Sequence, residues 1–193
     1  MKGCRPLTKD EVQRILSLTD VALRDKVLFI LGINTGYRIS ELLSLQVSNV
    51  MDPTGQILPQ VSVKASNMKG KSGRAIKLNS KTKGILGKFC KGRDLNAPLF
   101  QSRVKGKYHA PKAVSRSRAH IIFQEMFQRA KVFGSVATHS MRKTFAQGMR
   151  KLLNGDIVNL MKAMGHRSIN TTMAYMVFDN DEIDSAIEQL SFF

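Results

Sequence analysis

Apolar residues recur at helical spacing through most of the chain. In the first such segment, LTKDEVQRILSL, Val12, Ile15 and Leu16 follow one face. Thr8 stands just before them as an N-cap, and Glu11 completes a capping box. The pattern predicts that a helix begins at this point of the chain.

The second segment, VALRDKVLFILGIN, is apolar on almost every side, which predicts a largely buried helix. Asn34 and Gly36 in NTGYR signal the turn that ends it. A short helix is then expected to restart in SELLSLQ, with Ser40 as its cap.

The hydrophobic period changes from helical to alternating after residue 51. Val61 and Val63, and then Ile76 and Leu78, alternate with polar residues, which predicts a few short strands. The polar, glycine-rich NMKGKSG between them is typical of a hairpin tip.

Helical spacing returns in the second half of the chain. AHIIFQEMFQRAKVF carries one apolar stripe: Ala119, Ile122, Phe123, Met126, Phe127 and Ala130. Further helices are expected at 80–91, about 139–152, 156–164, 168–177 and 180–190. With no internal repeat and no shift of composition, the sequence predicts a single domain over 1–193. Its fold class is α+β, mainly α-helical, with a small antiparallel β-sheet.

Charge narrows the class of partner. The chain has 31 Lys and Arg against 14 Asp and Glu, a net charge of +17 spread along its length. Such an excess favours nucleic acid, more than an anionic membrane, a ribosomal role or a merely basic soluble protein. The sequence lacks the ~18 uninterrupted apolar residues of a membrane helix, so no membrane partner is expected. Cys4 and Cys90 have no metal-like spacing and are read as free thiols of a reducing, cytoplasmic compartment.

One short stretch suggests which kind of anion the positive charge binds. In ATHSMRKTFA, His139 and Arg142 are three residues apart, so on a helix they share one face. Thr138 is a candidate cap, and the first amides of the helix add partial positive charge. A guanidinium beside an imidazole suits a phosphate, although this spacing alone is common in basic helices.

The pattern becomes specific when it is combined, in order, with three other stretches. TGYRISELLSL contains Arg38, NMKGKSGRAIKL contains Lys69, and MGHRSINTTMAYM contains His166 and, nine residues on, Tyr175. Together they resemble the catalytic domain of the tyrosine recombinases, the phage integrase family, from about RPLTKDEV to the C-terminus.

The resemblance implies transesterification of a DNA phosphodiester through a 3′-phosphotyrosine bond, without cofactor, metal or ATP. The implied catalytic residues are Arg38, Lys69, His139, Arg142, His166 and Tyr175. The arginines clamp the phosphate with His166 as a further donor, Tyr175 attacks, His139 takes the proton, and Lys69 protonates the leaving oxygen. Glu41 falls where relatives carry an acidic residue that supports the fold.

Two positions depart from the family pattern, since Lys77 replaces a common proline and Lys143 a common histidine. Basic residues near the motifs and in SRVKGKYHAPKAVSRSR are expected to contact double-stranded DNA, unless they only form a solvated loop. They are Lys71, Arg74, Arg103, Lys105, Lys107, Arg116, Arg118 and Lys143.

Several alternatives stay open at this point. Arg38 can pair with Glu41 on the surface, and His166 can cap a helix. Tyr37 and Tyr108 compete as nucleophiles. The proton donor can be another cation of the hairpin: Lys64, Lys71, Arg74 or Lys77.

Nine residues of unbroken helix would place His166 and Tyr175 on opposite faces. We therefore expect Gly165 to end one helix and Ser168 to cap the next. Tyr175 then lies on a separate segment that can swing in and out.

Most relatives carry an N-terminal core-binding domain, which is absent here. The chain is therefore either a fragment or a short member such as the fimbrial-switch invertases. The acidic tail, about 178–193, has Ile183, Ile187 and Leu190 on one stripe. This tail is expected to dock on a neighbouring protomer of a DNA-bound homotetramer, or else to pack on its own domain. Before DNA binds, the protein is expected to be a monomer or a weak oligomer. Accessory DNA-bending proteins are a further expected partner.

The reaction class leaves three functions open. The first is a site-specific recombinase for integration, excision, inversion or resolution, acting at a bacterial nucleoid or encoded by a phage or plasmid. The second is a DNA-relaxing enzyme like type IB topoisomerases. The third is a catalytically silent DNA-binding protein of the same fold.

Overall fold

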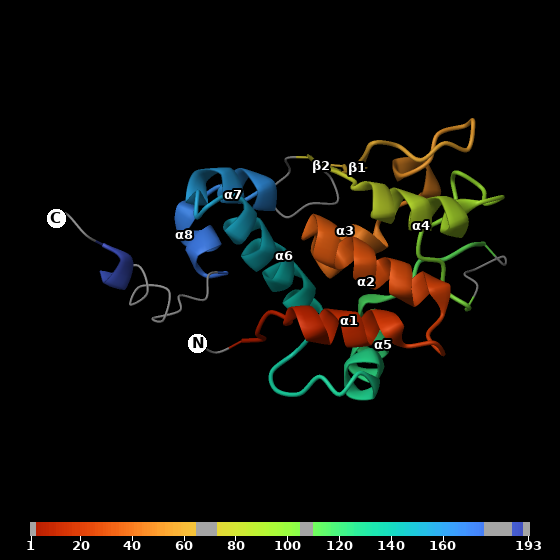
Figure 1. Ribbon diagram of the computed structural model, residues 1–193. Helices are drawn as coiled ribbons and strands as arrows, with labels where there is room; N and C mark the ends of the chain where they lie inside the picture. The colour runs from red at the N-terminus through yellow and green to blue at the C-terminus, as the bar shows by residue number, and fades with distance from the viewer. Residues whose placement is uncertain (1–2, 65–72, 105–109, 176–186, 191–193) are drawn as a thin grey trace.

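The computed structural model describes residues 3–64, 73–104, 110–175 and 187–190. It is mainly helical, with one two-stranded antiparallel sheet in the described part of the chain (Figure 1). The elements are α1 (Lys9–Ser17), α2 (Leu23–Thr35), α3 (Ile39–Leu43), η1 (Val47–Asn49), β1 (Gln60–Val63), β2 (Arg74–Lys77), α4 (Ser80–Cys90), α5 (Arg116–Arg129), α6 (Thr138–Leu152), α7 (Ile157–Met164) and α8 (Ile169–Met173). The expected fold class is confirmed.

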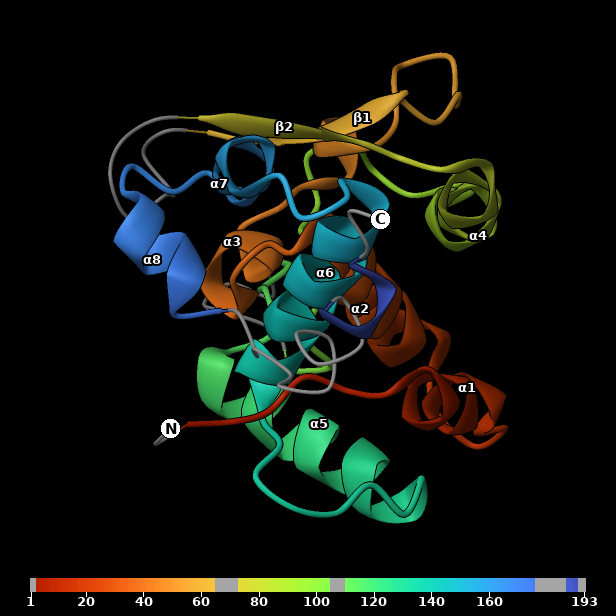
Figure 2. The ribbon, with the colours of Figure 1, turned by 60° about the vertical axis from the view of Figure 1, so that its left-hand side comes forward.

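Helix α2 is the centre of the arrangement and packs against α3, α4 and α6. Helix α6 continues to α7 and α8, which lie together at one end of the molecule (Figures 1 and 2). The two strands pair in the register Val61 to Ile76, and both expected strand segments are confirmed. In Figure 2 the two strands run along the top of the view, from above α7 toward α4.

The predicted start of α1 is confirmed in detail. The Thr8 hydroxyl accepts from the Glu11 amide at 3.2 Å, and the Glu11 carboxylate accepts from the Thr8 amide at 2.9 Å. The same carboxylate pairs with Arg5 at 2.6 Å, and the pKa of Glu11 falls to about 2, mainly through this hydrogen bond. Glu11 therefore stabilises both the helix start and the segment before it.

Glycines in the left-handed region end two helices, as the sequence predicted. Gly36 follows α2 with φ 60°, and Gly165 follows α7 with φ 64°. A Cβ on Gly36 would collide with the Phe145 ring, and one on Gly165 would lie 2.9 Å from Arg74 Cδ. Both positions need glycine because a neighbour occupies the space of a side chain.

Three predicted caps differ from the structure. Ser40 lies inside α3, and Arg38 is the residue before that helix, its amide donating to the Glu41 carboxylate at 2.8 Å. Thr138 is the first residue of α6 and not its cap. Ser168 is at the N-cap position of α8 but makes no side-chain cap bond. At α3 and α6 an earlier residue took the N-cap position, whereas at α8 the position was predicted correctly and only the side-chain bond is missing.

At α6 the N-cap is Ala137, whose amide donates to the Ser140 hydroxyl at 3.1 Å. The Ser140 hydroxyl therefore satisfies the amide just before the helix, whereas a capping Thr138 would have satisfied an amide inside its first turn. His139 consequently lies in the first turn of α6, where the free amide groups point.

The buried residues form a main core and a smaller one. The main core includes all five expected buried positions of α5 that lie within that helix. The smaller core consists of Phe145, Ala146, Leu160 and Met164, and Tyr175 packs against it. This second core joins α6 to α7 and supports the segment that carries Tyr175.

Some expectations fall largely outside the described residues. Most of the NMKGKSG hairpin tip belongs to 65–72, and most of the expected last helix belongs to 176–186. Of the tail, residues 187–190 are described, with Ile187 and Leu190 both 62% exposed. No helix among the described residues has the length and apolar character needed to cross a membrane.

We expect Gly36→Ala to destabilise the fold. The left-handed backbone costs an L-residue about 1–2 kcal/mol, and displacing the Phe145 ring adds about 1–3 kcal/mol. Urea unfolding measures the loss. Gly55→Ala is the matched control, because Gly55 has φ 85° and nothing within 4 Å of its added Cβ. Equal losses for the two variants would contradict the close approach of Phe145.

Candidate active site

The candidate site is organised around the buried guanidinium of Arg142, which is 1% exposed. Its Nη1 donates to the carbonyl of Gly36 at the end of α2. Its Nη2 donates to the carbonyl of Met164, at 2.8 Å, at the end of α7. The last carbonyls of a helix have no partner within the helix and carry partial negative charge, so they hold the cation in place.

Arg74 is held in the same way from the other side. It donates to the Met164 carbonyl at 2.7 Å and to the carbonyl of Thr35, and its guanidinium stacks over the Tyr37 ring at 4.5 Å. It is 8% exposed. The sequence placed Arg74 on the DNA surface, and the structure turns its side chain inward because helix-end carbonyls bind it. It therefore supports Arg142 by sharing a carbonyl with it.

Arg38 reaches the site from the residue before α3. Its Nη1 donates to the Glu41 carboxylate at 2.8 Å, so the ion pair that the sequence left open does form. The Arg38 side chain stays 24% exposed, whereas that of Glu41 is 1% exposed. Glu41 therefore orients Arg38 while leaving part of its guanidinium open to an incoming ligand.

His166 contacts Arg142 directly. Its Nε2 lies 2.8 Å from Arg142 Nη2, and a guanidinium can only donate, so Nε2 accepts this bond. The expected role of His166 as a donor toward a phosphate is therefore not the role it has in this arrangement. Its backbone amide donates to the Met161 carbonyl at 3.0 Å, so His166 helps to cap the end of α7 through its backbone, while its ring binds Arg142 and Thr172.

Tyr175 and His139 complete the cluster. The Tyr175 hydroxyl lies 3.3 Å from His139 Nε2, and its ring centroid is 5.1 Å from that of His166. The Arg142 guanidinium lies 5.5 Å from the Tyr175 ring. Five of the six expected catalytic residues are thus brought together, and the sixth, Lys69, lies outside the described residues.

Positive charge in this cluster exceeds negative charge. Burial and then the charge of Arg38 lower the pKa of Arg142, and burial and then Arg142 lower that of Arg74 to about 10. Among the described residues, Glu41 is the carboxylate that acts on both, and it is already paired with Arg38. Such a site favours a bound anion.

The two histidines respond to the same field. Burial, then Arg142 and Arg38, lower the pKa of His166 to about 4. Although His139 reaches solvent, desolvation by the surrounding protein, and then Arg142, Arg38 and Lys143, lower its pKa as well. At neutral pH both imidazoles are therefore uncharged, and His139 can accept a proton from a neighbouring hydroxyl.

The competing nucleophile Tyr37 is enclosed in the core. It is 1% exposed, and its hydroxyl lies 2.5 Å from the Arg74 carbonyl and 3.0 Å from that of Val61. Burial raises its pKa to about 12. Tyr37 therefore contacts the backbone of both hairpin strands through its hydroxyl. Tyr108 lies outside the described residues.

The expected DNA contacts lie in different places. Arg116 lines a groove of about 730 Å³ together with Ile39 and Thr138, which are the neighbours of Arg38 and His139 in the chain. Ser117, His120 and Ile121 complete its lining. Lys143 lies next to Arg142 on α6 and is half-buried. Lys71, Lys105 and Lys107 lie outside the described residues.

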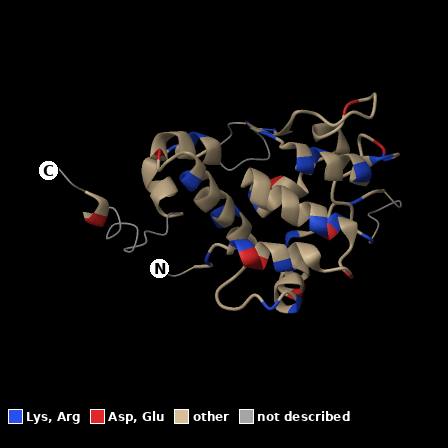
Figure 3. Ribbon diagram, in the orientation of Figure 1, with Lys and Arg blue, Asp and Glu red and all other residues tan. Residues whose placement is uncertain are grey.

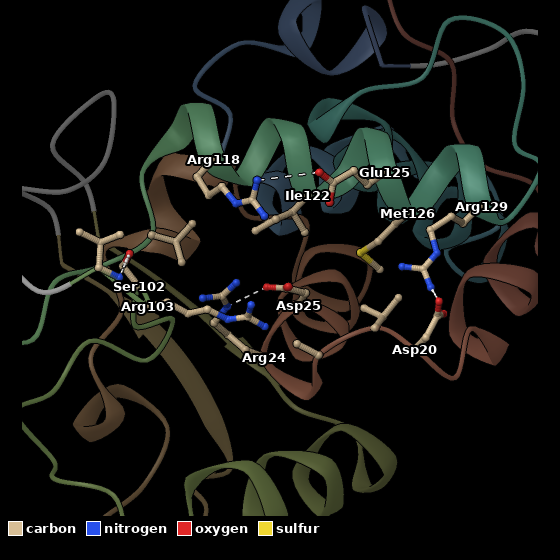
Figure 4. A pocket seen from close by; sticks show the side chains of 14 residues that line it. Asp20, Arg24, Asp25, Ser102, Arg103, Arg118, Ile122, Glu125, Met126 and Arg129 are labelled. Carbon is tan, nitrogen blue, oxygen red and sulfur yellow. Dashed lines mark hydrogen bonds and ion pairs between the residues drawn. The ribbon is translucent and has the colours of Figure 1, made fainter.

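Arg103 and Arg118 line a separate cavity of about 290 Å³ between α2 and α5 (Figure 4). Here arginines face carboxylates: Arg24 pairs with Asp25 at 2.7 Å, Arg118 with Glu125 at 3.8 Å, and Arg129 with Asp20. Lys and Arg are spread over most elements of the fold (Figure 3). Charge alone therefore does not mark the site, and what distinguishes the Arg142 cluster is the shortage of carboxylates.

Sequence reasoning missed two participants. Thr172 is fully buried and contacts His166 Nδ1 at 3.0 Å. The Met164 carbonyl binds two arginines. The Thr-Thr pair was visible as part of a motif, but a backbone carbonyl leaves no sequence signal.

Comparisons with known proteins point to one family. The model of the phage integrase family matches residues 5–181. The chain is 31% identical over 163 residues to the probable integrase/recombinase YoeC of Bacillus subtilis strain 168, covering 84% of this chain and 82% of that protein. It is 27% identical over 197 residues to tyrosine recombinase XerC of Vibrio parahaemolyticus, covering 96% and 59%.

The fold is also similar to that of a solved complex. The crystal structure of the XerH site-specific recombinase bound to difH substrate, a pre-cleavage complex, matches with a TM-score of 0.69 at 20% identity. The match covers 97% of this chain and 55% of that one. The chain thus spans a little over half the length of XerC and of XerH.

We expect the ring of His166 to titrate near pH 4, and Arg38→Gln to raise that pKa because one nearby cation is lost. NMR titration of the histidine rings measures both values. Arg24→Gln, in the cavity of Figure 4, is the control and leaves the pKa of His166 unchanged. An unaltered His166 pKa in Arg38→Gln would contradict the shared field.

The lowered pKa of His166 also predicts how the free energy of unfolding changes with pH. His166 has a lower pKa folded, about 4, than its ordinary 6.5, so the unfolded chain binds more protons between these values. The free energy of unfolding therefore falls as pH drops from 6.5 toward 4. His166→Gln makes this dependence shallower, as urea unfolding at several pH values would show.

Proposed function

The chain belongs to the phage integrase family, as its motifs predicted, and we propose that it is a site-specific DNA recombinase that forms a 3′-phosphotyrosine bond. The observation that carries the proposal is the Tyr175 hydroxyl, placed 3.3 Å from His139 and beside a cluster of cations short of carboxylates. A nucleophile, a base and an anion site thus lie together.

In the proposed reaction the Tyr175 oxygen attacks the phosphorus of one DNA strand. The bond to the 5′-oxygen breaks, and the strand end becomes esterified to the protein. The phenol proton must leave during attack, and His139 Nε2 accepts it. The lowered pKa of His139 supports this role because it keeps the imidazole neutral at pH 7.

The departing 5′-oxygen needs a proton, which we assign to Lys69 on the strength of the family motif. A 5′-hydroxyl of a partner duplex then attacks the phosphotyrosine, and the phenol leaves with a proton. Because the bond is exchanged rather than hydrolysed, the scheme needs neither ATP nor a metal ion.

Arg38 and Arg142 are the proposed clamp for the non-bridging oxygens. The partly exposed Arg38 side chain meets the phosphate first. Arg142 Nε is buried without a partner among the described residues, so it retains an unused donor. Removing one such preorganised donor typically slows a reaction about 10²- to 10³-fold.

Double-stranded DNA is the proposed substrate. The net charge of +17 and the groove that carries Arg116 beside the catalytic cluster support it. The similar XerH structure is described as bound to difH substrate. On this basis the duplex would pass over the groove, and Lys143, next to Arg142 on α6, is proposed as a further contact.

The assembly remains part of the proposal. We propose a homotetramer on paired DNA sites, with the tail from about residue 178 docking on the next protomer. The exposed Ile187 and Leu190 support a docking role for the tail. Accessory DNA-bending proteins are proposed to assist, in a bacterial nucleoid or in the context of a phage or plasmid.

We expect Tyr175→Phe to abolish covalent attachment to DNA. A library of nicked duplexes with a random site is incubated with the protein, and adducts that survive denaturant are recovered and sequenced. Mass spectrometry of the nuclease-digested adduct should place a nucleotide 3′-phosphate on Tyr175. Tyr37→Phe is the matched control, and keeps the adduct because Tyr37 is enclosed in the core.

Other outcomes separate the alternatives. Relaxation of supercoiled plasmid without exchange between two sites would favour the topoisomerase-like function. DNA binding with no adduct from any library member would favour the catalytically silent protein. An adduct that persists in Tyr175→Phe would refute the assigned nucleophile.

The two arginines at the start of α5 should behave differently. Arg116→Ala should weaken DNA binding, because Arg116 lines the groove beside the site. It should also reduce by about 1 the steepness with which the logarithm of the binding constant falls with the logarithm of the salt concentration. Arg118→Ala should have less effect, since Arg118 faces the cavity of Figure 4 and pairs with Glu125. Fluorescence anisotropy at several salt concentrations measures both, and a larger loss for Arg118→Ala would contradict the proposed DNA path.

A further inference from the structure

The segment that carries Tyr175 is attached to the molecule in an unusual way. Helix α8 has one buried residue, Thr172, which is 0% exposed. Ile169 is 46% exposed, Met173 is 38% exposed, and the neighbouring Thr171 is exposed. The apolar residues of this helix therefore provide little of its anchoring, and a threonine lies at the point of closest contact.

The partner of Thr172 is His166, whose Nδ1 lies 3.0 Å from the Thr172 hydroxyl oxygen. On the other side of the ring, Nε2 accepts from Arg142 at 2.8 Å and so carries no proton. A neutral imidazole has one N–H, which must then be at Nδ1. Nδ1 consequently donates to the Thr172 hydroxyl.

We propose that Thr172 is a positioning residue, which holds His166 in the Nδ1–H tautomer so that Nε2 orients Arg142, and which docks the nucleophile segment on this ring. Thr172 need not touch the substrate for this role. It acts through His166, whose ring is placed between the threonine and the guanidinium.

The geometry of α8 means that the hydrogen bond between Thr172 and His166 also positions Tyr175. Tyr175 is three residues after Thr172, and its amide donates to the Thr172 carbonyl at 2.9 Å. When Thr172 binds His166, the Tyr175 hydroxyl is therefore placed near His139 on the same side of the cluster. One hydrogen bond thus joins the position of the attacking group to the orientation of the clamp.

The groups around His166 reinforce the tautomer. Arg142 comes from α6, Arg38 from the start of α3 and Arg74 from β2, and all three bring positive charge toward the ring. A second proton is disfavoured in that field, so the neutral ring must choose one nitrogen. If the Thr172 hydroxyl is removed, Nδ1–H loses its acceptor in a buried place, which is costly.

The first test uses the full chain without DNA, labelled with ¹⁵N at histidine. The ring nitrogen shifts report which nitrogen carries the proton. In the wild type and in Thr172→Ser we expect the proton of His166 on Nδ1. In Thr172→Val, which keeps the shape of the side chain but removes the acceptor, we expect a mixture of tautomers. Thr171→Val is the matched control and leaves the tautomer unchanged.

The second test measures the rate of adduct formation on a nicked duplex recovered from the library, and this arm alone rests on the proposed function. We expect Thr172→Val to be about tenfold slower, as one lost hydrogen bond would allow, with Thr172→Ser and Thr171→Val near the wild-type rate. If Thr172→Val does not fold, as judged by circular dichroism, Thr172→Ala replaces it in both tests.

Two results would overturn the inference. One is a wild-type His166 that carries its proton on Nε2, and the other is a Thr172→Val or Thr172→Ala variant that keeps the pure Nδ1–H tautomer. Failure of the wild type to form an adduct with any DNA would instead count against the proposed function. The NMR result stands in that case, so the two failures are distinguishable.

Discussion

The structure depends on the capture of a buried cation by the ends of two helices. Arg142 donates to the carbonyl of Gly36 after α2 and to that of Met164 at the end of α7. Both helices stop at a left-handed glycine, which leaves those carbonyls free to accept. One side chain of α6 thereby fixes the positions of two other helices, while the helix ends hold its guanidinium in one orientation.

This manner of holding a cation explains the electrostatics of the site. Carbonyl dipoles orient a guanidinium but do not cancel its charge, whereas a carboxylate does both. The cavity between α2 and α5 uses carboxylates and is close to balanced. At Arg142 the charge remains available, and the lowered pKa of His166 and of His139 reflects it. The site is thus suited to a phosphate.

The proposed clamp and the proposed nucleophile are attached to the fold in different ways. Arg142 belongs to a helix of 15 residues that packs against the centre of the fold, whereas Tyr175 follows a helix of five residues. The bond between Thr172 and His166 connects the two parts. The position of the Tyr175 segment and the orientation of Arg142 are therefore linked through the ring of His166.

The sequence by itself determined the helix limits at Gly36 and Gly165 and the capping box at Thr8, and it supplied the candidate site residues, because glycine conformation, local caps and motif spacing act over a few neighbouring residues. Only the tertiary structure decided that Arg74 turns inward and that His166 accepts from Arg142. Those outcomes depend on carbonyls and side chains from elements far apart in the chain, and a backbone carbonyl is the same at every position of a sequence.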